Sequence, residues 1–382
     1  MAFGRLPSVR RVFLREHIQS DIAHLLALAE LMAQRYQTEV ADLGRSAQEI
    51  ARLWIENLRG YSSAHSANHR LRTGYLTNPA GEGVALLLYA ADDRMAKGVQ
   101  CLHPRTFHLG AQRFHGACIA DFAVSREHRS LGPALMLLRR IAEVGVERFD
   151  LVYGLPNAKS TAVCKRAGLK CVGYIRRYVK VLRLRDQLAR RIPAWMATPV
   201  AWASDPLLRC RDLLRSYSAG PRLTCRPTTW SDAKLDLLWA QRPKDMLLSD
   251  RSSRSLTWRF NSIDSTMWQV CLIEDQAGAP HGYVVWSRHG QVAKVGDFFA
   301  PAMQQSVTAM MLAFARLARA EGASSVSVEF FGDQAVVSAL MRAGMLERED
   351  QQPVFEVDAS LLAGKAEAKP HSYLTCFDSD AD

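Results

Sequence analysis

Apolar and polar positions alternate at helix and strand periods in two similar parts of the chain. In the first part, one helix face is marked by apolar side chains at three- and four-residue spacing: Ala134, Leu137, Leu138, Ile141 and Val144. This spacing predicts a helix from Gly132 to about Arg148. The apolar run Phe149–Tyr153 that follows it predicts a strand.

The second part repeats the pattern of the first. Sliding the chain along itself places Asp121-Phe122 on Asp297-Phe298 and, with no gap in between, Arg166–Gly168 on Arg342–Gly344. Roughly fifty residues stay in register, which is the signature of an internal repeat. We therefore expect two copies of one structural unit.

The second copy predicts the same elements in the same order. A helix is expected from about Ser306 to Arg319, followed by a strand from Ser324 to Phe331. In both copies a short helix then ends at a glycine. Gly168 and Gly344 occupy positions where a helix end favours the left-handed conformation.

Strands joined by turns precede each copy, at Val84–Ala90, Cys118–Val124, Trp268–Ile273 and Gly282–Trp286. Each half thus combines an antiparallel meander with a strand-helix-strand unit. The expected fold class is α/β, with two tandem domains, each a mixed, mostly antiparallel sheet flanked by helices.

Prolines mark the joint between the halves. Pro193, Pro199 and Pro206 are expected to prevent one continuous helix over Ile192–Pro206. The expected divisions are a first domain at 1–185, a linker or helical connection at 186–218, a second domain at 219–358 and a loose tail at 359–382.

Composition places the chain among globular proteins. It has 382 residues, 48% hydrophobic and 23% charged, which excludes disorder throughout. No apolar stretch approaches the roughly 20 residues of a bilayer span, and we find no signal peptide. The eight cysteines form no C-x-x-C pair and no zinc spacing with histidine, so we expect reduced thiols, no metal site and a cytoplasmic protein.

Positive charge is concentrated in one segment, residues 159–191, which we call the basic belt. It holds eleven lysines and arginines against one acid, whereas the whole chain carries a net charge of +11. A solvated face is the common meaning of such a run. The alternative is an acidic partner or an anionic membrane surface, with Trp195 and Trp202 nearby, and hence a peripheral position at the inner face of the membrane. Because the positive charge is confined to one segment, it does not favour nucleic acid as a partner.

A candidate phosphate site lies where the first strand leads into the helix, at Arg129-Ser130-Leu131-Gly132-Pro133-Ala134. A glycine-containing turn at a helix N-terminus exposes backbone N–H groups that bind phosphate. Gly132 permits close approach, and Arg129 adds a charge. The alternative is an ordinary helix-initiating turn.

These residues carry a family resemblance. Phe122-x-Val124 followed by R-x-x-G-x-A resembles the acyl-CoA signature of the GNAT (N-acyltransferase) superfamily, and Asn157, Ser160, Gly168 and Leu169 fit its next unit. The resemblance implies a tandem GNAT-fold protein that uses acetyl-CoA or another acyl-CoA. It assigns the pantetheine arm to the Val124 backbone and Asn157, and the pyrophosphate to Arg129, Ser130, Leu131, Gly132 and Ala134.

Two departures from the family pattern are informative. Cys164 stands where the family often has a tyrosine acid, and a small packing residue is the favoured interpretation over a nucleophile. In the second copy, Gln305, Thr308 and Met310 replace Arg129, Gly132 and Ala134. The second half is therefore expected not to bind CoA in the usual way, and to wall the substrate cleft.

Asp121 is the candidate general base, because it is the carboxylate on the strand that enters the motif. Asp297 occupies the matching position in the second copy, which favours a structural role equally. His108 and His115 are weaker candidates. Trp258-Arg259-Phe260 is expected to pack between helix and sheet, with substrate stacking as the alternative.

The resemblance implies an acyl-CoA-dependent N-acyltransferase that acts on an amine of a small molecule, amino sugar or peptide by direct attack on the thioester. Two alternatives remain open at this point. One is acyl transfer from aminoacyl-tRNA or acyl carrier protein. The other is a non-catalytic binding protein on a degenerate GNAT scaffold.

Overall fold

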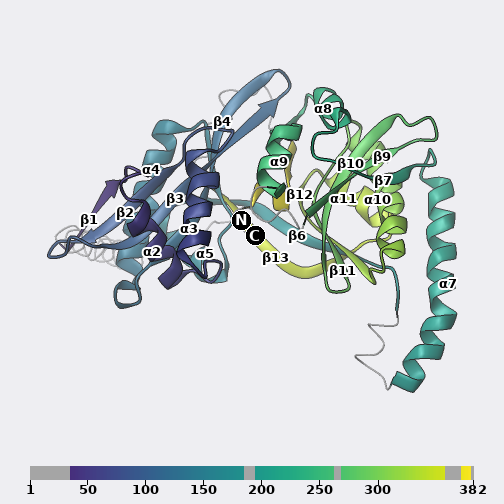
Figure 1. The fold of residues 1–382 in the computed structure, drawn as a ribbon, viewed down its shortest axis with the longest axis horizontal. Coiled ribbons are helices and arrows are strands. Elements are labelled where there is room, and N and C mark those ends of the chain that lie inside the picture. The colour runs from purple at the N-terminus through teal and green to yellow at the C-terminus, as the bar shows by residue number, and fades with distance from the viewer. Residues whose placement is uncertain (1–34, 185–193, 262–267, 358–370, 380–382) are drawn as a thin grey trace, which may run out of the picture.

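The computed structural model of the chain describes residues 35–184, 194–261, 268–357 and 371–379, with the backbone alone for 194–204 and 371. Helices pack on both faces of a mixed sheet (Figure 1), so the predicted α/β fold class is confirmed. The first half of the chain runs from β1 to β6, and the second from α7 to the end.

The elements of the first half are β1 (Tyr36–Val40), α2 (Ala47–Asn57), α3 (Ala64–Arg70), the π-helical turn η1 (Leu71–Leu76), β2 (Val84–Ala90), β3 (Ala96–Leu109), β4 (Gln112–Val124), the 3-10 turn η2 (Arg126–His128), α4 (Leu131–Arg148), β5 (Leu151–Gly154), α5 (Ala158–Ala167) and β6 (Lys170–Val181). The second half contains α7 (Ala194–Ser218), β7 (Thr224–Thr228), α8 (Ala233–Ala240), β8 (Met246–Ser249), α9 (Ser253–Asn261), β9 (Trp268–Glu274), β10 (Pro280–His289), β11 (Val292–Phe299), α10 (Met303–Ala320), β12 (Ser325–Gly332), α11 (Gln334–Arg342), β13 (Leu346–Glu356), β14 (His371–Leu374) and the 3-10 turn η3 (Cys376–Asp378). The order from β2 to β6 recurs from β9 to β13, as the sequence repeat predicts.

Both predicted helix ends adopt the conformation that requires glycine. Gly168 has φ 94° and Gly344 has φ 88°, in the left-handed region. The predicted strands and the helices α4 and α10 are also present, with ends that differ by a few residues. Local signals in the sequence therefore suffice for these elements.

Strand β2 shows how the first half buries both faces of its sheet. Val84, Leu86 and Leu88 pack with the apolar face of α4. Ala85 and Leu87 point to the opposite face, where α2 and α3 supply a second core around Trp54. Alternate residues of a strand point to opposite faces, so an almost entirely apolar strand is stable only between two helical layers.

The two halves exchange their last strands. Strand β13 of the second half pairs with β5 of the first, placing Phe355 opposite Gly154. Strand β6 of the first half pairs with β12 of the second, from Val181 opposite Ser325 to Arg176 opposite Phe330. Because β6 and β13 also pair with each other, the described strands form one continuous sheet. The domain boundaries at 185 and 219 stay a prediction. Strand pairing joins the two predicted domains, because β6 pairs with β12 and β13 pairs with β5.

The prolines do not interrupt the connection between the halves, so that expectation is wrong. Helix α7 runs from Ala194 to Ser218 through Pro199 and Pro206 (Figure 1). Each proline removes one backbone hydrogen bond, and the other bonds of a long helix, with its contacts to α10, maintain it. Among the described helices, none is both long and apolar enough to cross a bilayer.

The expectation of a loose tail is wrong for residues 371–379. Strand β14 pairs with β12 and β8, and the turn η3 after it is buried. Arg105 of β3 and Arg259 of α9 both donate to the Ser379 carbonyl, at 3.3 Å. Strand pairing and hydrogen bonds from distant arginines thus hold a segment that Gly364, Pro370 and the acids at 378, 380 and 382 led us to expect loose.

We expect the two halves to unfold in one thermal transition, because the exchanged strands give each half part of the other's core. Phe355→Ala should lower the free energy of unfolding of the whole chain by about 3 kcal/mol, since Phe355 is fully buried in the first-half core. Differential scanning calorimetry checks this. Two separate transitions, with only one shifted by the variant, would contradict it.

Candidate functional site

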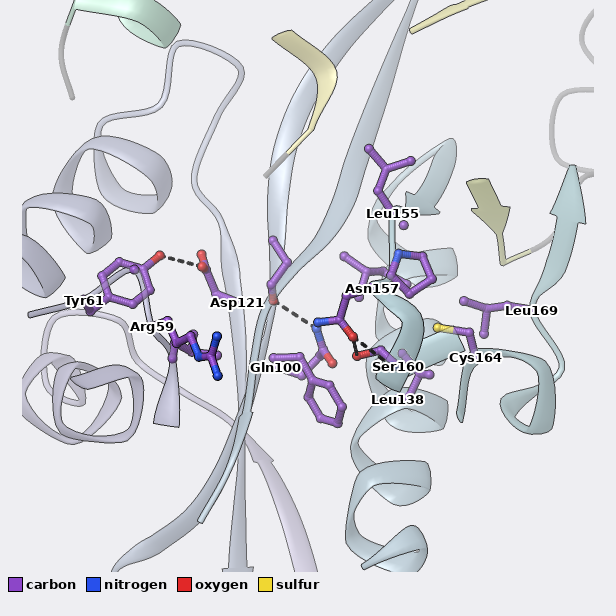
Figure 2. Close-up of a pocket in the computed structure, with 17 residues that line it drawn as sticks. Arg59, Tyr61, Gln100, Asp121, Leu138, Leu155, Asn157, Ser160, Cys164 and Leu169 are labelled. Atoms are coloured by element: carbon purple, nitrogen blue, oxygen red, sulfur yellow. Dashed lines mark hydrogen bonds between the residues drawn. The ribbon is translucent and has the colours of Figure 1, made fainter. Parts of the chain in front are cut away.

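A pocket opens where two parallel strands of the first half separate. Strands β4 and β5 pair only from Gly116 opposite Leu151 to Ile119 opposite Gly154, after which β5 ends and β4 continues to Val124. The pocket beside this gap has a volume of about 330 Å³. Figure 2 shows side chains from β3, β4, α5 and the loop after α2 around it.

A β-bulge in β4 turns the strand at the pocket. Cys101 of β3 pairs with Ala120, and Val99 pairs with Ala123, so Asp121 and Phe122 together stand opposite one residue. Asp121 has φ 51°, the one positive φ outside glycine among the described residues. This conformation is unfavourable for a side chain and requires compensating contacts.

The Asp121 carboxylate receives those contacts. It accepts hydrogen bonds from the Tyr61 hydroxyl at 2.6 Å, the Arg70 Nε at 3.2 Å and the Tyr75 hydroxyl. The Trp54 indole donates to its backbone carbonyl at 3.3 Å. Burial, with the neighbouring carboxylate, raises the pKa of Tyr75 well above its usual value, so this hydroxyl remains a donor.

The contacts of Asp121 favour its structural role. Its negative charge is balanced by Arg70, and both side chains are buried. A general base needs its lone pairs directed at the substrate, whereas these are directed at three donors from the protein. The catalytic role of Asp121 stays a prediction.

The residues assigned to the pyrophosphate lie at the start of α4. The Arg129 Nε donates to the Val124 carbonyl at 2.9 Å, and its Nη2 donates to the Asn57 side chain at 3.0 Å, so this guanidinium closes the end of β4. Ser130 is the N-cap residue and makes no side-chain cap bond. The N–H groups of Leu131 and Gly132 are in the first turn, where a helix offers no acceptor, and Pro133 has none. The N–H of Ala134, the fourth helical residue, faces the Ser130 carbonyl. The ligand of these residues stays a prediction.

Helix α5 forms the opposite wall of the pocket. The Asn157 side-chain oxygen accepts from the backbone N–H groups of Lys159 and Ser160, both at 3.0 Å, and thereby caps the helix. Burial raises the pKa of the Cys164 thiol to about 11, which keeps it protonated at neutral pH. This agrees with the packing interpretation of Cys164.

Three polar residues at the pocket were not identified from the sequence. Arg59 and Tyr61 come from the loop between α2 and α3, and Gln100 comes from the middle of β3. The loop precedes the repeat, so no motif pointed to it. Gln100 stands in a buried strand, where a polar residue among apolar neighbours was the available signal.

The remaining sequence candidates lie outside this pocket. Neither His108 nor His115 lines it. Trp258 packs on the Arg105 guanidinium, Phe260 is in the second-half core, and Arg259 binds C-terminal carbonyls. The packing interpretation of this tripeptide agrees with these contacts.

In the second half, the C-terminal segment fills the corresponding gap. Strands β11 and β12 pair only as far as Val295 and Val328. Beyond that point β14 pairs with β12, and the Tyr373 hydroxyl donates to the Phe298 carbonyl of β11. The Thr308 hydroxyl, in the second turn of α10, donates to the Ala339 carbonyl at 3.0 Å. The protein itself thus occupies the space that is open in the first half.

Asp297 repeats the environment of Asp121. It accepts from the Arg251 Nε at 3.1 Å, the Tyr283 hydroxyl at 2.7 Å and the Thr375 hydroxyl at 2.6 Å. Burial raises the pKa of Asp297, and Arg251 opposes that rise. A buried aspartate with an arginine and a tyrosine donor is therefore common to the filled and the open half, which is further support for a structural role.

Comparisons with known proteins identify the fold. No protein-family model and no curated protein matches the sequence. A solved GCN5-related N-acetyltransferase from Anabaena variabilis has a TM-score of 0.58 at 15% identity, over 86% of this chain and 74% of that chain. A probable N-acyltransferase from Enterococcus faecalis gives 0.57 at 11%, over 84% and 71%. A GCN5-related N-acetyltransferase from Kribbella flavida gives 0.52 at 16%, over 85% and 71%. At sequence identities this low, the matches show similarity of fold alone.

We expect Asp121→Asn to lower the free energy of unfolding by about 3 kcal/mol, because Arg70 would remain buried without its counter-charge. Urea denaturation monitored by tryptophan fluorescence measures this. A variant with unchanged stability and a turnover reduced by about 10²–10⁴ would instead show that Asp121 is the base.

Proposed function

We propose that this chain, which has the fold of the GCN5-related N-acetyltransferases, transfers an acyl group from acyl-CoA to an amine in the pocket between β4 and β5. The acceptor class is an amine of a small molecule, an amino sugar or a peptide. A bound acyl-CoA supplies a thioester whose carbonyl carbon is open to attack by a neutral amine. The C–N bond forms, the C–S bond breaks, and CoA leaves as its thiol with the proton that the amine loses.

One unsatisfied polar atom carries the proposal. The Gln100 side chain is 1% exposed, and its amide nitrogen donates to the Ala120 carbonyl at 2.9 Å. Its Oε1 is buried and has no hydrogen-bond partner among the described residues. Because a buried acceptor without a donor costs about 1–3 kcal/mol, this oxygen at the pocket wall favours a ligand with an N–H group.

The surroundings of this oxygen fit both substrates. The pocket walls are mainly apolar, with Ile119, Phe122, Leu138 and Leu155 among them, and such walls suit a pantetheine arm and exclude water. The uncapped start of α4 leaves N–H groups for phosphate. In this proposal Leu131, Gly132 and Ala134 hold the pyrophosphate, and Asn157 and the Val124 backbone hold the pantetheine.

The protein residues have separate tasks in this arrangement. Gln100 accepts a hydrogen bond from the attacking amine and orients its lone pair. Asp121 and Arg70 maintain the bulge that keeps β4 away from β5, and so keep the pocket open. Arg129 fixes the end of β4 next to the phosphate-binding turn.

Replacing Gly132 with Glu is expected to abolish CoA binding, because a carboxylate would block and repel the pyrophosphate. Isothermal titration calorimetry with acetyl-CoA measures this. Gln305→Glu, an exposed change in the first turn of α10, is the matched control in the second half. If Gly132→Glu binds normally and Gln305→Glu does not, the two halves are assigned the wrong way round.

Gln100→Leu should leave the fold intact and lower acyl transfer about tenfold or more, since the amine loses a hydrogen bond of about 1.5 kcal/mol. Release of free CoA thiol with a panel of amines gives the rate, and thermal unfolding gives the stability. An unchanged rate with every accepted amine would remove Gln100 from the site.

A further inference from the structure

The outer face of helix α7 is apolar and exposed. Leu207, Leu213, Leu214 and Tyr217 have exposed fractions of 70%, 54%, 65% and 71%. They are among the large apolar side chains that the described residues leave in solvent, and they lie within three turns of one helix. We call these four residues the α7 face. Figure 1 shows α7 along the outside of the second half.

Helix geometry places these side chains on one side. Leu207, Leu214 and Tyr217 recur at spacings of seven and three residues, and the exposed Cys210 lies between them. Asp212 points the other way, toward β6 and α10, and is buried. Since Pro206 does not break the helix, the apolar face is continuous over this region.

Arginines surround the α7 face. Arg209 and Arg211 are exposed on the same helix. The Arg222 guanidinium lies 5.3 Å from the centre of the Tyr217 ring. An apolar face with cationic borders and an aromatic side chain is the pattern of helices that lie in a membrane interface.

A basic pocket of about 400 Å³ adjoins this face. Its walls include four arginines and one acid, with Leu213 shared by the pocket and the α7 face: Arg183, Arg209, Asp212, Arg316 and Arg319. Asp212 is already bound by Lys180 at 2.6 Å and by Arg319 at 2.9 Å. The pocket therefore keeps a net positive charge that suits a phosphate group.

The basic belt identified in the sequence offers less free positive charge at the surface than its composition suggests. Arg176 and Arg177 form ion pairs with Glu347 and Asp350 of β13, and Lys180 is fully buried against Asp212. These charges hold the exchanged strands and the linker helix together. Arg185, Arg190 and Arg191 lie outside the described residues, as do the side chains of Trp195 and Trp202.

We propose that α7 binds the surface of an anionic phospholipid membrane. The α7 face enters the boundary between headgroups and acyl chains, and the arginine pocket beside Leu213 receives a headgroup phosphate. Binding through both parts explains why apolar side chains and guanidinium groups are exposed next to each other. The pocket of the first half plays no part in this interaction.

Cosedimentation of the full chain with vesicles tests the proposal. Vesicles of phosphatidylcholine alone are compared with vesicles that also contain phosphatidylglycerol, at low and high salt. Wild type should bind the anionic vesicles, and salt should weaken the binding. Free glycerol phosphate, added as a competitor, distinguishes occupation of the pocket alone from binding to the membrane surface, since it should not release a chain held by its apolar face.

Two double variants and two matched controls separate the contribution of the arginines from that of the apolar side chains to vesicle binding. Arg209→Gln with Arg211→Gln should weaken vesicle binding about tenfold or more. Leu214→Glu with Tyr217→Glu should abolish it. The controls are Leu237→Glu, at a leucine of α8 that is 56% exposed, and Arg254→Gln on α9, and neither should change binding.

Three results would overturn the proposal. Wild type could bind neutral and anionic vesicles equally, the control variants could lose as much binding as the α7 variants, or glycerol phosphate could release the chain completely. Light scattering tests separately whether the α7 face joins two copies of the chain. If light scattering shows a wild-type dimer that Leu214→Glu with Tyr217→Glu makes monomeric, and vesicles are not bound, the α7 face joins two copies instead.

Discussion

The exchange of β6 and β13 is the constraint on which the rest of the molecule depends. Each half needs a last strand beside its short parallel strand, β5 or β12, and each takes that strand from the other half. The ion pairs of Arg176 and Arg177 with β13 join the same two strands. The pocket, the linker helix and the C-terminal segment are therefore joined through one continuous sheet.

The two copies share a framework and differ in what fills it. In both, a buried aspartate binds an arginine and a tyrosine where the central strand turns away from its parallel neighbour. The first copy leaves a pocket at this point, and the second receives residues from β14 and η3. The same aspartate, arginine and tyrosine contacts are thus present where the sheet opens onto a pocket and where protein residues fill the opening.

The sequence predicted those features that depend on neighbouring residues. The face of α4, the strand β2 and the two left-handed glycines follow from spacing and from steric limits on single residues. Those signals also located the turn at Arg129–Ala134 and the strand with Asp121. The GNAT resemblance rested on the same short stretch, and the fold comparison agrees with it.

Features that depend on distant partners were not predictable in this way. Strand β13 fits beside β5 as well as beside β12, because the repeat makes the two edges alike, so local pattern cannot choose between them. The partners that hold residues 371–379, Arg105, Arg251 and Arg259, are more than a hundred residues away in the sequence. Tyr61 and Gln100 carry no motif, and only the folded sheet brings them to Asp121.

The burial of Asp378 has a consequence for how the chain is made. Together with Asp297, this residue pairs with Arg251 inside the second half, and all three side chains are fully buried. During synthesis, Arg251 emerges from the ribosome long before Asp378 does, so the buried cluster of Arg251, Asp297 and Asp378 is complete only after residue 378 has been made. Until then Arg251 pairs with Asp297 without Asp378, and the face of the second half that residues 371–379 cover is open to proteases.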